Sequence, residues 1–124
     1  MSVANNFKGR KVIVENGFLC AGQYERVSAG GSNLDLSTAA NNGLYAPELG
    51  IDPAGGAIDV ILEPEADCAG LKRTIYNRAD ASETITVKND AGSSLGTIEQ
   101  NRAAILYCDG TSWTFEAKWT ISLS

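Results

Sequence analysis

The chain has 124 residues, a formal net charge of −5 and no histidine. Its length favours one domain with a core large enough to fold without metal or disulfide cross-links. The fractions of hydrophobic (44%) and charged (20%) residues are those of a globular protein, which excludes a disordered chain. The acidic balance argues against a protein that mainly binds phosphate backbones. The missing histidine excludes Ser-His-Asp triads, Cys-His dyads and His-containing zinc sites.

The first third of the chain contains few signals of regular structure. Residues 1–11 lack the apolar run of a signal peptide, and no run of 18 apolar residues occurs, so we expect a protein made in a cytoplasm without a membrane span. Short strands are predicted over residues 11–15 and 18–20, on either side of an Asn-Gly turn. Residues 21–33 are predicted to be a loop or an extended connection. We therefore expect an N-terminal arm with the first strands in 1–33, and a β-domain in 34–124.

The middle of the chain combines one short apolar run with many turn residues. Residues 34–36 are predicted to be extended, and residues 37–43 to form a single helical turn or a loop. Prolines and glycines then predict no regular structure from Pro47 to Gly56. This part is expected to be an exposed loop.

From Ala57 onward the pattern is that of dense β-structure. In residues 84–88, Ile85 and Val87 alternate with polar residues, which predicts a half-buried strand. Residues 89–92 predict a hairpin, and Asp109-Gly110 predicts a two-residue hairpin turn. The predicted strands are 58–62, 71–77, 84–88, 95–98, 102–108, 112–115 and 118–123. The fold class is therefore all-β: a compact β-sandwich or jelly-roll-like domain with short strands, or a small barrel, with an extended N-terminal arm.

The three cysteines, Cys20, Cys68 and Cys108, are far apart and contain no C-x-x-C pair. This spacing supports neither a disulfide framework nor a thiolate metal site. One interpretation is that they are small buried side chains in strands. The alternative is one bridge, within a chain or between subunits, formed after release from a reducing cell.

The second half of the chain resembles a module of tailed-bacteriophage virion proteins. The resemblance rests on an Asn-ended strand at 75–77, the hairpin ETITVKNDAG at 83–92, LGTI at 95–98 and AAILYCDGTSW at 103–113. Head-decoration (cement) proteins and tail- or head-fibre proteins carry this module, which covers about residues 57–119. The resemblance implies a small β-sandwich or jelly-roll-like unit that forms homotrimers. Because the sequence shows no fibre shaft, repeat array or coiled coil, a compact decoration protein is favoured.

Two groups of residues are candidates for contacts with partners. Trp113, Phe115 and Trp119 lie close together in the sequence, and Tyr107 precedes them on the neighbouring predicted strand. On one bent strand the first three side chains could point to one side. They are either core residues or anchors of an interface with another subunit or with the capsid shell.

The second group is basic and lies near the N-terminus: Phe7, Lys8, Arg10 and Lys11. These residues are either a solvated start to the first strand or an arm that lies on a neighbouring subunit or an acidic capsid surface. Contact with nucleic acid is not expected, since the rest of the chain is acidic.

Several carboxylates lie close together in the sequence, as catalytic and metal-binding carboxylates can. Glu63, Glu65 and Asp67 surround a proline, and Asp80 and Glu83 lie in a turn, without the spacing of a calcium-binding loop. We expect them to be turn residues and solvated edges. No Ser-x-x-Lys occurs either, so the sequence predicts no catalytic residue, no metal, no cofactor and no enzymatic activity.

The leading hypothesis is a homotrimeric capsid decoration protein that binds the major capsid protein on the outside of the virion and stabilises the head. The basic N-terminal segment and the loop at 43–56 are expected to face the capsid. The alternative is a fibre or receptor-binding tip protein whose exposed Trp or Tyr stacks on host glycans. Neither hypothesis includes direct contact with nucleic acid or a membrane.

Overall fold

The computed structural model describes residues 23–122. Within this range the regular secondary structure is almost entirely β-strand, which confirms the predicted fold class. The elements are β1 (Tyr24–Ser28), β2 (Leu34–Asp35), β3 (Glu48–Asp52), β4 (Ile58–Ile61), the 3-10 turn η2 (Glu65–Asp67), β5 (Lys72–Asn77), β6 (Ile85–Lys88), β7 (Ser94–Ile98), β8 (Arg102–Cys108) and β9 (Trp113–Thr120). The strands predicted over 11–15 and 18–20 lie outside the described residues.

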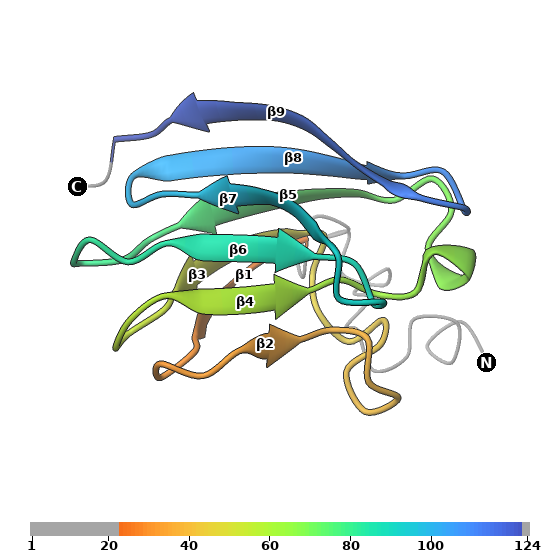
Figure 1. Ribbon diagram of the computed structural model, residues 1–124, viewed down its shortest axis with the longest axis horizontal. Helices are drawn as coiled ribbons and strands as arrows, with labels where there is room; N and C mark the ends of the chain where they lie inside the picture. Colours follow the sequence, from red (N-terminus) through yellow and green to blue (C-terminus); the bar gives the residue numbers. More distant parts are fainter. Residues whose placement is uncertain (1–22, 123–124) are drawn as a thin grey trace, which may run out of the picture.

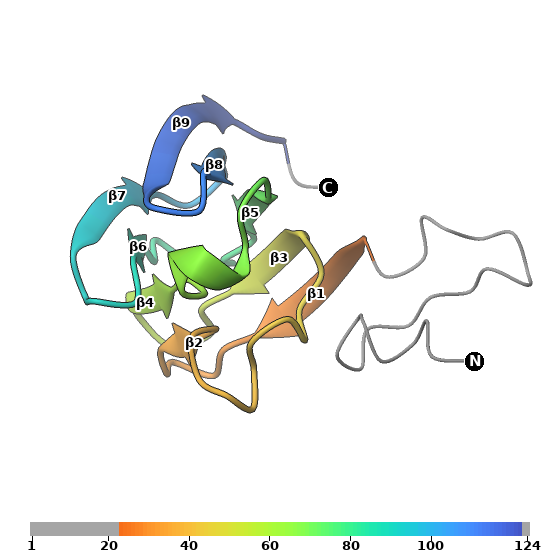
Figure 2. The same cartoon turned by 90° about the vertical axis from the view of Figure 1, so that its right-hand side faces the viewer.

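Two sheets pack face to face and enclose one core (Figures 1 and 2). The larger sheet has the strand order β1-β3-β5-β8-β9, and the smaller sheet has the order β2-β4-β6-β7. The molecule is therefore a compact two-layer β-domain. β1 belongs to it as an edge strand, paired with β3 along its whole length, so the expected boundary at residue 33 does not separate β1 from the sandwich.

The first six strands form a coil that alternates between the two sheets. β1, β3 and β5 are parallel neighbours in the larger sheet, and β2, β4 and β6 are parallel neighbours in the smaller one. Tyr24 pairs with Glu48 and Glu48 with Thr74, while Ile58 pairs with Ile85, so one turn of the coil takes 24 to 27 residues. The sequence does not reveal this backbone repeat, because successive turns of the coil share no residue pattern beyond apolar side chains at inward-facing positions.

The last three strands run antiparallel and join the two sheets at one side. β7 pairs with β6, whereas β8 and β9 extend the larger sheet beyond β5. Lys118 Nζ of β9 donates hydrogen bonds to the carbonyl oxygen of Thr97 in β7 (2.9 Å) and to Glu99 (2.9 Å). The sandwich is thus held together between β7 and β9, while β1 and β2 are edge strands on the opposite side.

Inward-facing side chains form columns that cross the turns of the coil. Leu34, Val60 and Val87 are paired in register through β2, β4 and β6, and all three are buried. In β6, Ile85 and Val87 are buried while Thr86 is half-buried, which confirms the alternation read from the sequence. Each such aliphatic side chain contributes roughly 1.5–3 kcal/mol when it is buried.

Asn77, which ends β5, is a buried polar residue whose hydrogen bonds are satisfied. Its amide nitrogen donates to the carbonyl oxygens of Glu83 (2.7 Å) and Ile98 (2.9 Å), and its amide oxygen accepts from the backbone of Ala79 (3.0 Å). Asn77 therefore joins the end of β5 to the β5–β6 connection and to β7. These bonds explain why β5 can end on a buried asparagine.

The predictions for residues 21–33 and 47–56 were partly wrong. Both segments contain a strand of the larger sheet, β1 and β3, and Leu49 and Ile51 of β3 are fully buried. Pro47 and Pro53 lie just outside β3, where they remove no donor within the strand. Because β3 is a central strand, residues 43–56 cannot form one exposed loop.

The turn and strands near the C-terminus also differ from expectation. Cys108 pairs with Trp113, so the connection contains residues 109–112 rather than a two-residue turn. Asp109 Oδ1 accepts hydrogen bonds from the backbone of Thr111 and Ser112, each 2.8 Å long. The strands predicted at 112–115 and 118–123 are one strand, β9, with a bulge.

Candidate functional site

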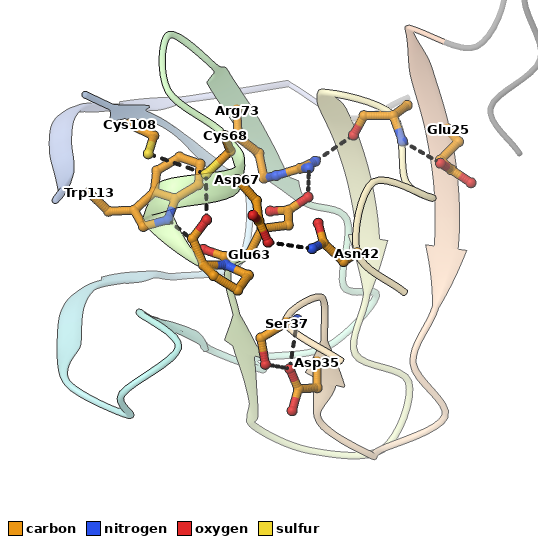
Figure 3. A network of polar contacts seen from close by, with 12 residues as sticks. Glu25, Asp35, Ser37, Asn42, Glu63, Asp67, Cys68, Arg73, Cys108 and Trp113 are labelled. Carbon is orange, nitrogen blue, oxygen red and sulfur yellow. Dashed lines mark hydrogen bonds and ion pairs between the residues drawn. The ribbon is translucent and has the colours of Figure 1, made fainter. Parts of the chain in front are cut away.

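Trp113 belongs to the core. Its side chain is buried, with 5% of the residue exposed, and its indole Nε1 donates a 2.9 Å hydrogen bond to the carbonyl oxygen of Glu63 (Figure 3). Buried tryptophans usually satisfy this donor in such a way. Of its two interpretations, Trp113 therefore fits the core interpretation in the isolated chain.

Phe115 also points inward, towards the smaller sheet. It is half-buried and lies against Gly96 of β7, where a Cβ atom would come within 2.7 Å of two ring carbons. This contact contributes to the junction between β7 and β9.

Trp119 and Tyr107 lie on the other face of the sheet. Phe115 pairs with Leu106, whereas Trp119 pairs with Ala103, and paired residues share a face while adjacent residues alternate. In β9 a bulge lies between Phe115 and Ala117, which pair with Leu106 and Ile105. The bulge reverses the alternation of inward and outward side chains along the strand. The three aromatic side chains of β9 therefore do not gather on one side, as the sequence spacing had allowed.

The outer face of the larger sheet brings together aromatic and apolar residues from four of its strands, β1, β5, β8 and β9. Ala103, with 0% exposure, pairs with Tyr76 on one side and Trp119 on the other, so the two aromatic neighbours shield it. The face comprises Tyr24, Tyr76, Ala103, Ile105, Tyr107, Ala117 and Trp119, and we call it the aromatic face. No strand within residues 23–122 packs over it.

Tyr24 is the most exposed aromatic side chain of this face, with 41% of the residue accessible. Its ring meets that of Tyr76 edge-on, with ring centroids 5.9 Å apart, and its hydroxyl lies over Gly50. Beside it is a cavity of about 250 Å³, whose lining residues are Arg26, Val27, Ser28, Gly50, Asp52 and Arg78. An aromatic ring thus borders a polar cavity.

The basic candidates Phe7, Lys8, Arg10 and Lys11 lie outside the described residues. Their assignment to an arm stays a prediction.

A second cavity, of about 380 Å³, lies where the β2–β3 and β4–β5 connections meet at one end of the sandwich (Figure 3). At its base Glu63 and Arg73, which are 2% and 1% exposed, form an ion pair. Arg73 also donates to the carbonyl oxygen of Ala46, and the backbone of Ala46 donates to Glu25 (2.6 Å). Glu63 is therefore buried and paired, and the expectation of a solvated carboxylate was wrong. The local sequence around Glu63 does not reveal its partner, because Arg73 lies on β5.

Two polar atoms of this ion pair have no hydrogen-bond partner within residues 23–122: Glu63 Oε1 and Arg73 Nε. At the rim of the cavity, the Asn42 amide donates to Asp67 Oδ2 at 2.8 Å. A buried donor and a buried acceptor at the base could accommodate a water molecule or a small polar group.

Cys68 and Cys108 are close together beside this cavity. Their sulfur atoms are 3.2 Å apart, Cys68 is half-buried and lines the cavity, and Cys108 is fully buried. Burial, followed by the hydrogen bond to Cys108, raises the pKa of the Cys68 thiol. The Cys68 thiol is thus protonated at neutral pH. Their separation of 40 residues in the sequence concealed this proximity.

Three carboxylates from two turns of the coil also converge. Oxygen atoms of Asp52, Asp80 and Glu83 lie within 4.8 Å of one another. The backbone of Ala54 donates to Asp52 (3.0 Å), and that of Gly55 donates to Glu83 (2.9 Å). Two of the three carboxylates therefore already accept hydrogen bonds from the backbone of the turn after β3. The proximity of the three carboxylates alone does not define a metal site.

Comparison of the chain with protein-family models, with curated proteins and with solved structures found no match. Within residues 23–122, no helix has the length and apolar character needed to cross a membrane.

Proposed function

We propose that this protein is a capsid decoration (cement) protein of a tailed bacteriophage, which binds the major capsid protein on the outer surface of the head as a homotrimer. The observation that carries the proposal is the aromatic face. Tyr24, Tyr107 and Trp119 remain partly exposed there, and Trp and Tyr are enriched as anchors of protein interfaces. The resemblance of residues 57–119 to phage virion modules supports the same assignment.

The partner that we assign to the aromatic face is another copy of the chain. Arg26, Lys72 and Glu48 lie on the same face, so it presents charges of both signs around its apolar residues. Lys72 and Glu116 are 3.8 Å apart on this side of the molecule. A surface of mixed charge can be complementary to another copy of the same chain, whereas a surface of one sign would repel its copy.

Trimerisation would strengthen a weak contact with the shell. Three identical footprints on one rigid particle bind together, since the second and third contacts form at high effective concentration. In this proposal the basic segment with Lys8, Arg10 and Lys11 supplies the footprint, and the aromatic face supplies the contacts within the trimer.

The first test is the number of copies per particle. Quantitative mass spectrometry of purified virions that contain the protein should find hundreds of copies, in proportion to the major capsid protein, and electron microscopy should place them on the head. A handful of copies at the tail or at one vertex would overturn the proposal.

The second test is the oligomeric state of the isolated protein. Sedimentation analysis should give three times the chain mass of 13.1 kDa, and Trp119→Ser should reduce it to the monomer. Asp90→Asn, an exposed change in the β6–β7 turn of the smaller sheet, is the control and should leave the trimer intact. A monomer at all concentrations, or a trimer unaffected by Trp119→Ser, would overturn the role of the aromatic face.

A glycan-binding fibre tip is the second candidate, and one observation favours it. Tyr24 is exposed beside the cavity lined by Arg26, Ser28 and Asp52, and an aromatic ring next to polar groups can stack on a sugar and bind its hydroxyls. Trp113, by contrast, is buried and cannot stack on a glycan. In this case a glycan array should give a signal that Tyr24→Ala removes, and the copy number should be low.

A further inference from the structure

The cysteine pair beside the end cavity suggests a modification site that is independent of the proposed function. We propose that Cys68 and Cys108 form an intramolecular disulfide when the folded protein meets a small-molecule disulfide. The bond would connect the segment that follows η2 to the end of β8.

The first observation is that the two thiols are placed for such a bond. Their sulfur atoms are 3.2 Å apart, so bond formation needs a movement of little more than 1 Å towards the ordinary S–S length of about 2 Å. Disulfide formation is therefore a local change.

The second observation is that the backbone already connects the two segments. Gly70 N donates to Cys108 O (2.8 Å), Cys108 N donates to Leu71 O (2.9 Å), and Leu71 N donates to Cys68 O (3.0 Å). These three bonds hold both Cα atoms whether or not the sulfur atoms are joined. Bringing the two thiols together in the folded protein therefore costs little conformational entropy.

The third observation concerns access. Cys68 lines the cavity of about 380 Å³, whereas Cys108 is fully buried. An external reagent therefore reaches Cys68 first, and Cys108 acts only on a neighbouring sulfur. This order suits a two-step exchange with a small disulfide, such as oxidised glutathione.

In the first step the Cys68 thiol loses its proton, and its sulfur attacks one sulfur of the small disulfide. One S–S bond breaks, a mixed disulfide forms at Cys68, and the first small thiolate leaves. In the second step Cys108, as its thiolate, attacks Cys68 Sγ and releases the second small thiolate. Two cysteine thiols are oxidised, one small disulfide is reduced to two thiols, and the two released protons balance the two thiolates.

The bond would close a loop between residues that are 40 positions apart. Cross-links over loops of this length reduce the entropy of the unfolded chain, so the oxidised protein should be more stable. Because the raised pKa of Cys68 keeps its thiol protonated, the exchange should be slow at neutral pH and faster in alkaline buffer.

The test uses the full chain with Cys20→Ser, which leaves only the two cysteines of the pair. After reduction and removal of the reductant, the folded protein is incubated with oxidised glutathione at pH 8.5 and followed by intact mass and thiol titration. We expect both thiols to disappear, the mass to fall by two hydrogens, and peptide mapping to join residues 68 and 108. The melting temperature should rise by roughly 10 °C, and dithiothreitol should reverse the change.

Two single variants in the same background provide the controls. Cys108→Ala should stop at a stable glutathione adduct on Cys68, and Cys68→Ser should take up no glutathione while folded. If Cys108→Ala does not fold, the two-cysteine protein and Cys68→Ser still decide the question. A persistent glutathione adduct, disulfide-linked dimers, or two unreacted thiols in the folded two-cysteine protein would each overturn the proposal.

Discussion

The indole of Trp113 donates a hydrogen bond to the carbonyl oxygen of Glu63, and this 2.9 Å contact joins the start of β9 to the segment that follows β4. The same Glu63 pairs through its side chain with Arg73 of β5. One residue that follows β4 thus connects three parts of the sandwich at the end where the cavity lies (Figure 3). Of the aromatic residues that lie close together near the C-terminus, Trp113 therefore stabilises the fold.

Replacing Trp113 with Phe should destabilise the protein by about 2–4 kcal/mol. The change removes the donor to the Glu63 carbonyl and leaves a gap in the core, and both effects cost free energy. Chemical denaturation measures the loss. Trp119→Phe, on the aromatic face, should cost under about 1 kcal/mol; equal losses at the two positions would contradict this placement.

Replacing Gly96 with Ala should cost about 1–3 kcal/mol, because the new Cβ would lie 2.7 Å from two ring carbons of Phe115. The reduced side chain in Phe115→Leu should restore part of this loss in the double variant. Gly92→Ala is the control, since Gly92 has a φ of 89° with open space around its missing Cβ. Its cost comes from the backbone and should be unaffected by Phe115→Leu. Strict additivity of Gly96→Ala and Phe115→Leu would refute the steric explanation.

Removing the cation of the buried ion pair should be among the most damaging changes. Arg73→Met would leave the Glu63 carboxylate buried without its partner and should cost about 3–5 kcal/mol. The double variant Glu63→Leu/Arg73→Met should recover much of this loss, because it leaves neither charge behind. Urea denaturation of the three variants provides the comparison. A double variant less stable than Arg73→Met alone would show that the pair itself stabilises the fold.

Acid should weaken the junction between β7 and β9. The hydrogen bond from Lys118 is the largest cause that lowers the pKa of Glu99, from its ordinary 4.5 to about 2. Because the folded-state pKa lies below the unfolded one, the stabilisation is complete above about pH 4.5 and is lost as the pH falls towards 2. The pair is partly solvated, so its contribution should be only about 0.5 kcal/mol.

Stability measured between pH 6 and 2.5 tests this effect. Glu99→Gln should show a shallower fall than the parent protein, and Asp90→Asn, an exposed change in the β6–β7 turn, should fall as the parent does. An unchanged slope in Glu99→Gln would show that other carboxylates cause the acid sensitivity.

Deletion of residues 1–10 tests the predicted role of Lys8 and Arg10. Within residues 23–122 the sandwich begins at β1, so the shortened protein should keep its fold and the proposed trimeric state. Co-sedimentation with capsids should show loss of binding. Binding equal to that of the full chain would place the capsid footprint elsewhere.

The sequence by itself determined most of the strands after residue 57. Alternation with a period of two placed Ile85 and Val87 inward, and turn residues ended most of these strands close to where the structure ends them. These features depend on neighbours a few positions apart, so a local pattern contains them. The all-β class follows from the same local chemistry.

Only the tertiary structure decided which distant segments meet. The parallel coil, the central place of β3, the pairing of Glu63 with Arg73 and the proximity of Cys68 to Cys108 all join residues that the local pattern treats separately. One bulge in β9 placed Trp119 on the face opposite to Phe115, because a single extra residue reverses the alternation of all that follow. Such relationships depend on strand order and register, which are determined by packing across the whole core.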